Sequence, residues 1–447
     1  MALYVLNIND VNLRIYRDTE LLLDEPGIAL IGEQTNSFGE TARKQIKQHP
    51  RQVNYTYWHR MNQDPLGFTG PLTHNHADLL YQQLGELVKR AGINDRDEFV
   101  IVVRSNTSNE QLSLLLGVCQ ECKIRVSGLV DVSAALLSMQ SAFHNNLVLD
   151  IGLQSLTVAE IAVVENGKHQ SVQKTGYSEL SELGLLPLMD AWLAIIADRF
   201  VSDVRFDPLR IADTEQQVFD QVYDWLIHPD RPDTLNIEVQ YETITRSIEI
   251  NESVLVNKAA RRYDLVQNKF GSPQCIWLTE TSSLLPGFRK ALTSAGHSVT
   301  NIESENIHHA IHKQLNYIVQ ESGPIQFVTA LKTTSEVKRN NLDKQPDKQH
   351  APTHILYRGL TVQLNSVQNR KFDRESFKTS AVELPGGEKD YPISLLTGSS
   401  GLKIDIPTES GWLLNNETLH ANQEIFAGDR LSLGQEQLEF IRVEDGT

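Results

Sequence analysis

The first three quarters of the chain alternate between short apolar runs and longer amphipathic stretches. Continuous or alternating apolar runs predict strands, and a period near 3.6 residues predicts helices. The expected strands cover residues 3–8, 13–16, 21–31 (with a Pro-Gly break), 99–103, 126–129, 147–149, 156–164 and 275–279, with a strand-and-turn segment at 236–250. The expected helices cover residues 77–91, 109–116, 132–138, 185–200 and 286–295. This alternation indicates a mixed α/β fold.

The same strand–turn–strand unit occurs twice. In the first copy, the strands at 3–8 and 13–16 flank the polar turn Asn9-Asp10-Val11-Asn12. In the second, an apolar run ends in Asp150-Ile151-Gly152, and its partner strand starts at Leu156. Each copy is followed by further helices and buried strands, so we predict two βββαβα-like halves joined near residue 145.

The last quarter of the chain has a different pattern. Residues 331–352 are almost wholly polar and are predicted to form a linker. Short apolar runs then recur between Gly, Pro and Asn turns from 353 to 447, which predicts an all-β sandwich. The expected strands cover residues 355–357, 360–364, 391–396, 402–406, 412–414, 431–433 and 438–443.

Composition narrows the class of protein. The chain has 447 residues, a formal net charge of -16 and three cysteines. The negative charge argues against a nucleic-acid surface, and three cysteines cannot form a disulfide framework. No apolar run is long enough to cross a membrane, and no basic segment precedes the first apolar residues. We therefore expect a cytoplasmic protein.

The order of the elements and four local motifs resemble the actin-like ATPase superfamily, which includes MreB and the DnaK-type heat-shock chaperones. The motifs, in order, are residues 24–29, 38–42, 129–135 and 276–288, the last resembling the adenosine motif of the family. The resemblance covers about residues 3–330. It implies a duplicated, two-lobed (ribonuclease-H-like) ATPase fold, with lobe I at 1–145 and lobe II at 146–330.

The resemblance also implies where ATP and Mg²⁺ would bind. Asp150 matches the Mg²⁺-binding carboxylate, and Asp131 matches the position of a water-orienting carboxylate. The remaining positions of the nucleotide motifs are held here by Asn7, Asn9, Asp10, Asn12, Gly152, Leu153, Gln154, Ser155, Thr279, Glu280, Thr281 and Ser282.

Several of these residues depart from the pattern of the family. Asn7 lacks the charge that holds hydrated Mg²⁺, and Asp10 places a negative charge beside the expected phosphates. Leu153 and Gln154 replace glycines in the second turn, and a glycine pair of the adenosine motif is replaced by Glu280 and its neighbour Thr281. We therefore predict a non-catalytic scaffold or assembly protein, a pseudo-ATPase that binds either no cofactor or ATP with Mg²⁺. The alternatives are an active actin-like or DnaK-type ATPase and an MreB-like filament former.

The C-terminal segment resembles the end of a forkhead-associated domain. The similarity lies in residues 414–419 and in Gly428-Asp429-Arg430-Leu431-Ser432-Leu433-Gly434. The Gly-Arg and Ser-x-x-His motifs that hold phosphothreonine in that family have no clear match here, so a charge-assisted phosphate donor is missing. We expect this domain to bind a protein partner, and the sequence is compatible with an oligomer.

Other candidate sites are weak. Cys119-x-x-Cys122 has half the spacing of a zinc site but no second ligand pair, so a core thiol pair is the favoured interpretation. His74-x-His76 and His308-His309 are expected to be chance pairs among 14 histidines.

Overall fold

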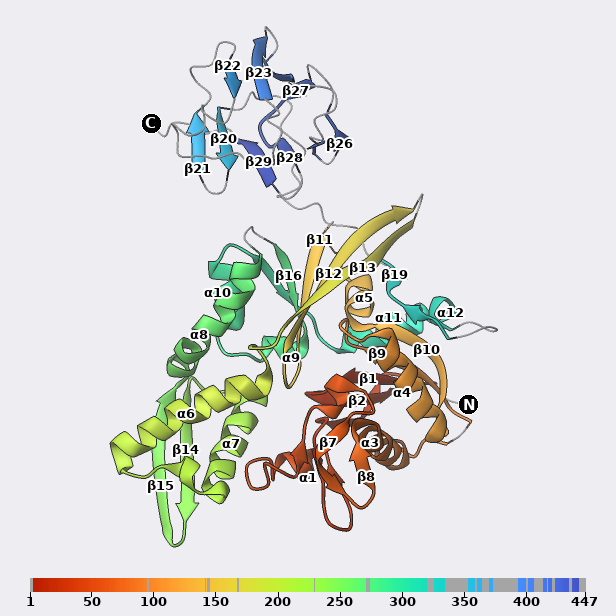
Figure 1. Cartoon of the computed structure of the whole chain (residues 1–447), viewed down its shortest axis with the longest axis vertical. Coiled ribbons are helices and arrows are strands. Elements are labelled where there is room, and N and C mark those ends of the chain that lie inside the picture. Colours follow the sequence, from red (N-terminus) through yellow and green to blue (C-terminus); the bar gives the residue numbers. More distant parts are fainter. Residues whose placement is uncertain are drawn as a thin grey trace. The chain divides into compact units, whose positions relative to one another are not determined.

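The computed structural model describes residues 3–333, apart from 95, 141, 143–144, 167–168, 229, 271–273 and 320–324, together with strands and turns between residues 353 and 441. The chain divides into two compact units, Met1–Lys338 and Arg339–Thr447. The first unit is mixed α/β and the second is built from strands (Figure 1). The predicted mixed α/β class is confirmed. Residues 1–145 and 146–330, which were predicted as two lobes, both belong to the first unit.

The N-terminal half of the first unit is built around a six-stranded sheet with the strand order β18-β10-β9-β1-β2-β3. Its strands are β1 (Leu3–Asn9), β2 (Asn12–Arg17), β3 (Glu20–Glu25), β9 (Glu98–Val103), β10 (Arg125–Asp131) and β18 (Phe327–Val328). β1, β2 and β3 form an antiparallel meander. β9 lies parallel to β1, and β10 lies parallel to β9.

The second six-stranded sheet repeats this arrangement, in the order β17-β16-β11-β12-β13-β19. Its strands are β11 (Asn145–Ile151), β12 (Leu156–Asn166), β13 (His169–Leu180), β16 (Cys275–Leu278), β17 (Ser298–Asn301) and β19 (Ala330–Lys332). Again the first three strands form an antiparallel meander, and two parallel strands continue from β11. The first residues of the predicted linker, 331 and 332, thus belong to β19, and residues 334–352 lie outside the described part.

Helices and small strands complete the first unit. The longer helices are α3 (His76–Arg90), α4 (Asn109–Glu121), α5 (Val132–Ser138), α6 (Leu185–Val204), α7 (Ala212–Ile227), α8 (Glu252–Lys269), α10 (Phe288–Ser294) and α11 (Glu305–Lys313). The short elements are β4 (Ala29–Leu30), β5 (Ser37–Phe38), α1 (Glu40–Arg43), β6 (Val53–Asn54), α2 (Tyr57–Arg60), β7 (Pro65–Gly70), β8 (Thr73–Asn75), η1 (Pro208–Arg210), α9 (Glu280–Ser283) and α12 (Leu315–Ile318). The hairpin β14 (Thr234–Tyr241) and β15 (Ile244–Asn251) forms a separate two-stranded sheet.

The five predicted helices are present. α4 begins where expected, because the Ser108 side chain accepts a hydrogen bond from the N–H of Gln111 and Gln111 returns one to the Ser108 N–H, a capping box. Among the longer helices, α7, α8 and α11 were not predicted. The apolar residues of α7 nevertheless recur at helical spacing, with Val218, Val222 and Trp225 all buried.

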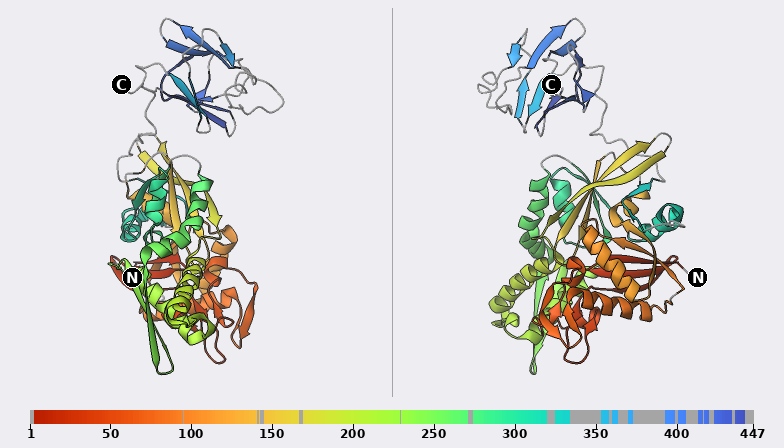
Figure 2. Two further views of the ribbon diagram at one scale, coloured as in Figure 1. Left: turned by 90° about the vertical axis from the view of Figure 1, so that its left-hand side faces the viewer. Right: turned by 45° about the vertical axis from the view of Figure 1, so that its right-hand side comes forward.

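Alternation along the central strands sorts their side chains into layers. In β9, Phe99 and Ile101 pack with α3 and α4, whereas Val100 and Val102 face a second core that also holds residues of α5, α11 and the second sheet. The other face of the second sheet packs on α6, α7, α8 and the β14–β15 hairpin. Figure 2 shows these helices and the hairpin gathered together in the first unit.

The two halves of the first unit share a core and a buried cation. Five apolar residues of the N-terminal half belong to the core of the second half: Val11, Ile28, Ala42, Ile46 and Val53. The Arg43 side chain is 3% exposed, and its Nη1 lies 3.0 Å from Oδ1 of Asp220 on α7. Its guanidinium also stacks over the ring of Tyr223, 4.2 Å from the centroid. The halves are therefore packed against each other as one unit.

The second unit is an all-β region, as predicted. Its strands are β20 (His354–Tyr357), β21 (Leu360–Gln363), β22 (Arg370–Phe372), β23 (Ile393–Gly398), β24 (Gly401–Asp405), β25 (Leu413–Leu414), β26 (Glu417–Thr418), β27 (Gln423–Ile425), β28 (Arg430–Leu433) and β29 (Glu436–Ile441). They form two antiparallel sheets, β21-β20-β29-β28-β25-β26 and β22-β23-β24-β27. Within the predicted forkhead-associated-like segment, the Asn415 amide donates to Asp429 (2.7 Å) and accepts from the N–H of Arg430 (2.9 Å). These bonds fix the turn before β28.

Among the described residues, no helix combines the length and the apolar character that crossing a membrane requires.

Candidate functional site

The two repeated turns meet in the interior of the first unit. The β1–β2 turn carries Asn9 and Asp10, and the β11–β12 turn carries Asp150, Gly152 and Leu153. The Asn9 amide donates to Asp150 Oδ1 and to the Ile151 carbonyl, both at 3.0 Å. The Leu153 N–H donates to Asp10 Oδ1 at 2.9 Å. Residues about 140 positions apart in the chain are thus hydrogen-bonded directly, turn to turn.

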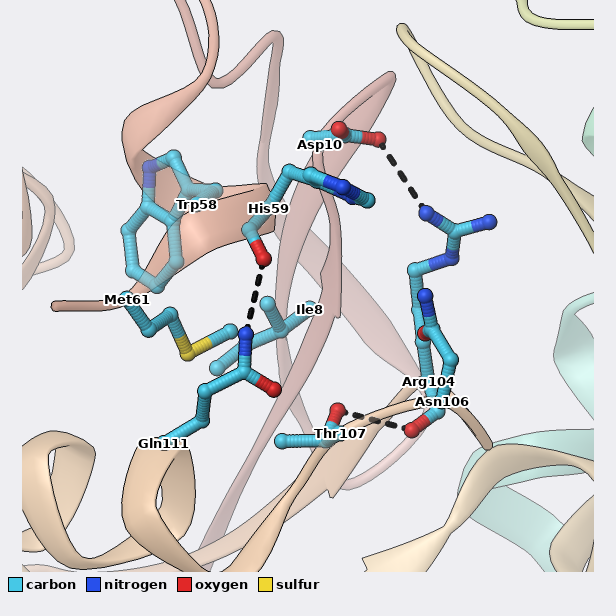
Figure 3. Close-up of a pocket in the computed structure, with 9 residues that line it drawn as sticks. All are labelled: Ile8, Asp10, Trp58, His59, Met61, Arg104, Asn106, Thr107 and Gln111. Atoms are coloured by element: carbon cyan, nitrogen blue, oxygen red, sulfur yellow. Dashed lines mark hydrogen bonds and ion pairs between the residues drawn. The ribbon is translucent and has the colours of Figure 1, made fainter. Parts of the chain in front are cut away.

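Arg104, which the sequence analysis missed, lies at the centre of this junction. It follows β9 and is buried, with its side chain 8% exposed. Its Nε donates to Asp150 Oδ2 at 3.0 Å, and its Nη2 donates to the Asp150 carbonyl and to Thr157 Oγ1, both at 2.9 Å. Its Nη1 lies 3.8 Å from Asp10 Oδ1, the contact drawn in Figure 3. One guanidinium therefore joins the two turns.

Gly152 is required by this arrangement. A Cβ at this position would overlap Arg104 Nη1 and would lie 2.7 Å from Asp10 Oδ1. The glycine therefore makes room for an arginine and a carboxylate of this chain. Its neighbour Leu153 is 1% exposed and belongs to the core of the second half. The hydroxyl of Ser155 is also engaged, since it donates to Glu179.

The Asp150 carboxylate is surrounded by protein groups. Besides Asn9 and Arg104, its Oδ1 accepts a hydrogen bond from Thr279 Oγ1 at 3.0 Å. Burial raises the pKa of Asp150, while the charge of Arg104 and the hydrogen bond from Thr279 oppose this change. Both carboxylate oxygens are therefore occupied by donors from three different segments.

The segment that resembles the adenosine motif closes the junction from the second half. Thr279 caps α9, and the Ser282 hydroxyl accepts from the N–H of Ile151 at 2.8 Å. Thr281 is buried, with its Oγ1 3.1 Å from that of Thr279. These three hydroxyls tie α9 to the β11–β12 turn.

Glu280 reaches across to the first half. Its carboxylate accepts two hydrogen bonds from Arg14 on β2, at 2.8 and 2.9 Å, and one from the N–H of Ser304 at 3.3 Å. Burial alone would favour the neutral acid, but the bidentate Arg14 contact outweighs it and lowers the pKa of Glu280 to about 2. Arg14 also binds Asp24 at 2.8 Å, so the pair continues into a three-residue ion network.

The Glu280 pair gives a pH-dependent contribution to stability. Because the folded-state pKa is about 2 and the ordinary value is 4.5, ionised Glu280 stabilises the fold above pH 4.5, and this contribution is lost as the pH falls toward 2. Glu280→Gln should therefore lower the free energy of unfolding by about 1 kcal/mol or less at pH 7, since the side chain is partly exposed. Urea unfolding at several pH values measures the difference.

The matched control for this prediction is Glu20→Gln, in an exposed pair with Arg17. We expect a smaller difference for this variant at every pH. A difference between the wild type and Glu280→Gln that stays constant from pH 7 to pH 3 would contradict the assignment.

Asp131 has a structural partner for each oxygen. Its side chain is fully buried, caps α5 through the N–H groups of Ser133 and Ala134, and accepts from Ser105 Oγ at 2.8 Å. Its Oδ2 lies 2.8 Å from Nζ of Lys174, on β13. Asp131 does not line either of the two small cavities beside the junction.

The two cavities beside the junction each measure about 20 Å³. The first is lined by Asp10, Arg104 and Trp58 (Figure 3), and the second by Asn7, Asn12 and Asp150. A water molecule needs roughly 10–15 Å³ by this measure, whereas pockets for drug-sized ligands are usually about 300–1,000 Å³. In this conformation the junction has room for about one water molecule on each side.

The arrangement does not fit a Mg²⁺–nucleotide complex. The Arg104 guanidinium already neutralises Asp150, and the Leu153 N–H, which the resemblance would place against a phosphate, donates to Asp10 instead. The described residues contain no group of three or more His, Cys, Asp or Glu placed to hold a metal ion. Burial raises the pKa of Cys119 to about 12 and that of Cys122 to about 11, so both thiols are protonated at neutral pH.

Comparison of the chain with models of protein families and with curated proteins gave no match.

Proposed function

We propose that this protein is a non-catalytic scaffold or assembly protein built on an actin-like body. In this body the former phosphate-binding turns have become a fixed internal junction. Two features support this proposal. The strand order β3-β2-β1-β9-β10 recurs as β13-β12-β11-β16-β17, and the first hairpin turns of the two sheets face each other. This is the arrangement that the resemblance to actin-like ATPases implies.

The observation that carries the proposal is the position of Arg104. In a phosphate site, backbone N–H groups and cations point toward an anionic ligand. Here the guanidinium hydrogen-bonds the Asp150 carboxylate and the Asp150 carbonyl, and approaches Asp10. The charges that would serve Mg²⁺ and phosphate in an ATPase neutralise one another inside this protein. The junction then stabilises the contact between the two halves without a ligand.

An active ATPase is the competing proposal, and it requires a different arrangement of the junction. Binding a triphosphate would require Arg104 to leave Asp150 and Asp10, and would leave both carboxylates beside the phosphates. Like charges at such distances repel by roughly 1–4 kcal/mol per pair at the effective dielectric constants of water and protein surfaces.

We also propose that the C-terminal all-β unit contacts a protein partner in the cytoplasm.

Calorimetric titration of the whole 447-residue chain with ATP and Mg²⁺ tests the proposal. We expect no saturable heat of binding up to about 1 mM nucleotide, and no rise in the thermal unfolding temperature. A working actin-like ATPase of known activity, titrated under the same conditions, is the positive control.

Micromolar binding by the wild-type protein would refute the proposal. The Glu280→Gln variant provides an internal check. If nucleotide did bind through the adenosine-like segment, removing this negative charge would strengthen binding, whereas we expect it to leave the titration flat.

A further inference from the structure

The two edges of the β14–β15 hairpin differ in the hydrogen bonding of their outward-facing backbone groups. On the β14 edge, Gln217 of α7 accepts from the N–H of Gln240 at 2.8 Å and donates to its carbonyl at 3.0 Å. Gln221, one turn later, accepts from the N–H of Glu238 at 2.9 Å and donates to its carbonyl at 2.7 Å. Two glutamine amides thus satisfy this edge as a neighbouring strand would.

The register of the hairpin shows which groups face outward on the other edge. Residues of an antiparallel pair that do not hydrogen-bond each other point their N–H and C=O groups away from the partner strand. Glu238 and Gln240 point outward, and they lie opposite Ser247 and Thr245. Ser247 and Thr245, and by the same alternation Glu249, therefore present backbone donors and acceptors on the outer edge of β15. In the part of the chain that the structure describes, β15 pairs only with β14.

A groove lies at the C-terminal end of β15, where Glu249, Ile250 and Asn251 line it. Its volume is about 480 Å³, far larger than the two cavities at the central junction. Its lining residues come from β15, the first turn of α8 and the C-terminal half of α6, three elements that Figure 1 shows close together in the first unit. Three apolar side chains line it: Ile195, Ile250 and Val254. An added strand would therefore find both unpaired backbone groups and an apolar surface.

The charges of the groove favour a basic occupant. Asp198 of α6 and Glu249 of β15 line it, and both are exposed. One arginine, Arg199, also lines the groove, and a second, Arg246, lies on β15, and both are already engaged. Arg199 binds Asp203 at 2.6 Å, and Arg246 stacks over Phe206, 4.6 Å from the ring centroid. The two carboxylates are thus the charges available to a ligand in this groove.

We propose that the outer edge of β15 binds an extended segment of a partner protein, in which apolar side chains alternate with basic ones. The segment pairs with Thr245, Ser247 and Glu249 as a third strand. Its apolar side chains lie in the groove beside α6, and its basic side chains meet Asp198 and Glu249. Main-chain hydrogen bonds supply affinity in this mode of recognition, and alternate side chains supply specificity.

This surface is independent of the nucleotide question, because none of its residues belongs to the Arg104 junction. Its test is performed without nucleotide. Failure of the peptide to bind would therefore leave the pseudo-ATPase proposal standing, and nucleotide binding would leave this surface standing.

Fluorescence anisotropy with a labelled peptide of about eight residues, alternating valine and lysine, tests the proposal on the whole 447-residue chain. We expect saturable binding to the wild type. Ser247→Pro should weaken it at least about tenfold, because proline removes an outward N–H while the bonds to β14 remain. The matched variant Ser247→Ala keeps the N–H and should bind within about twofold of the wild type. Circular dichroism checks that both variants are folded.

Reversing the charge of the two groove carboxylates provides a second test of the proposal. The double variant Asp198→Lys and Glu249→Lys should weaken the lysine peptide about tenfold and should bind a valine–glutamate peptide that the wild type does not. Equal binding to Ser247→Pro, or equal binding of the two peptides to the wild type, would overturn the proposal. So would a concentration-dependent dimer that Ser247→Pro abolishes, since a second copy of the chain would then be the occupant.

Discussion

Replacing Arg104 by methionine should lower the free energy of unfolding of the first unit by about 3–5 kcal/mol, the usual cost of breaking a buried ion pair. The Arg104 and Asp150 side chains are 8% and 7% exposed, so bulk water has little access to the carboxylate that the variant leaves behind. The variant leaves the Asp150 carboxylate with Asn9 and Thr279 as neutral donors. It also leaves Asp10 without its cation, although the Leu153 N–H still donates to it.

Urea unfolding followed by tryptophan fluorescence measures this effect, because four of the five tryptophans, Trp58, Trp192, Trp225 and Trp277, belong to the first unit. Arg17→Met is the matched control. It removes an arginine of β2 whose pair with Glu20 is exposed, and it should leave the transition near that of the wild type.

A double-mutant cycle that combines Arg104→Met with Asp150→Asn isolates the interaction energy between the two side chains. It separates this energy from any general destabilisation of the core. If Arg104 and Asp150 interact as described, the double variant should be more stable than the sum of the two single effects predicts, by about 1–3 kcal/mol. Additive effects would show that the two side chains do not stabilise each other. An Arg104→Met variant as stable as the wild type would refute the proposed role of the junction.

Gly152→Ala should destabilise the first unit by about 1–3 kcal/mol, as added atoms do in a packed interior. The new methyl group would overlap Arg104 Nη1 and crowd Asp10 Oδ1, and hydrogen bonds to Asp150 and Thr157 prevent the arginine from moving away. The same urea titration measures the effect. In an Arg104→Met background the methyl group loses its principal neighbour, so the added cost of the alanine should shrink.

Gly117→Ala is the matched control for this substitution. Gly117 lies inside α4, and a Cβ there would have no neighbour within 4 Å. We expect Gly117→Ala to stabilise the protein by up to about 1 kcal/mol, since alanine favours the helix and restricts the unfolded chain. Equal effects at Gly152 and Gly117 would contradict the close approach of Arg104.

Local patterns predicted the elements of the first unit where periodicity was strong. The apolar run at 99–103 became β9, and the amphipathic stretch at 77–91 became α3. Helix α7 was missed although its buried residues recur at helical spacing, because polar and acidic residues separate them. The β14–β15 hairpin was predicted only as a strand-and-turn segment. Its unequal edges depend on α7, which lies outside the hairpin sequence.

The candidate site was predicted in part. The sequence located Asp150, Gly152 and the β1–β2 turn, and the structure brings these residues together. It also indicated that Asp10 would repel a phosphate, but not that Asp10 would accept from the Leu153 N–H instead. Arg104 was missed, although a charged residue directly after the buried run at 99–103 was the available signal. A basic residue at the end of a buried strand needs an acidic partner, and no local pattern identifies it.

The sequence by itself determined the class of the fold, the two repeated strand–turn–strand units and the all-β character of the last quarter. Periodicity and turn chemistry act over a few residues, so these features can be read without knowing what lies nearby. Only the tertiary structure decided that Arg104 joins two turns that are far apart in the chain, and that one edge of β15 remains open beside a groove. Whether a charge or a backbone group is buried or paired is a property of the packed molecule. Both features therefore depend on how groups that are distant in sequence are placed relative to one another.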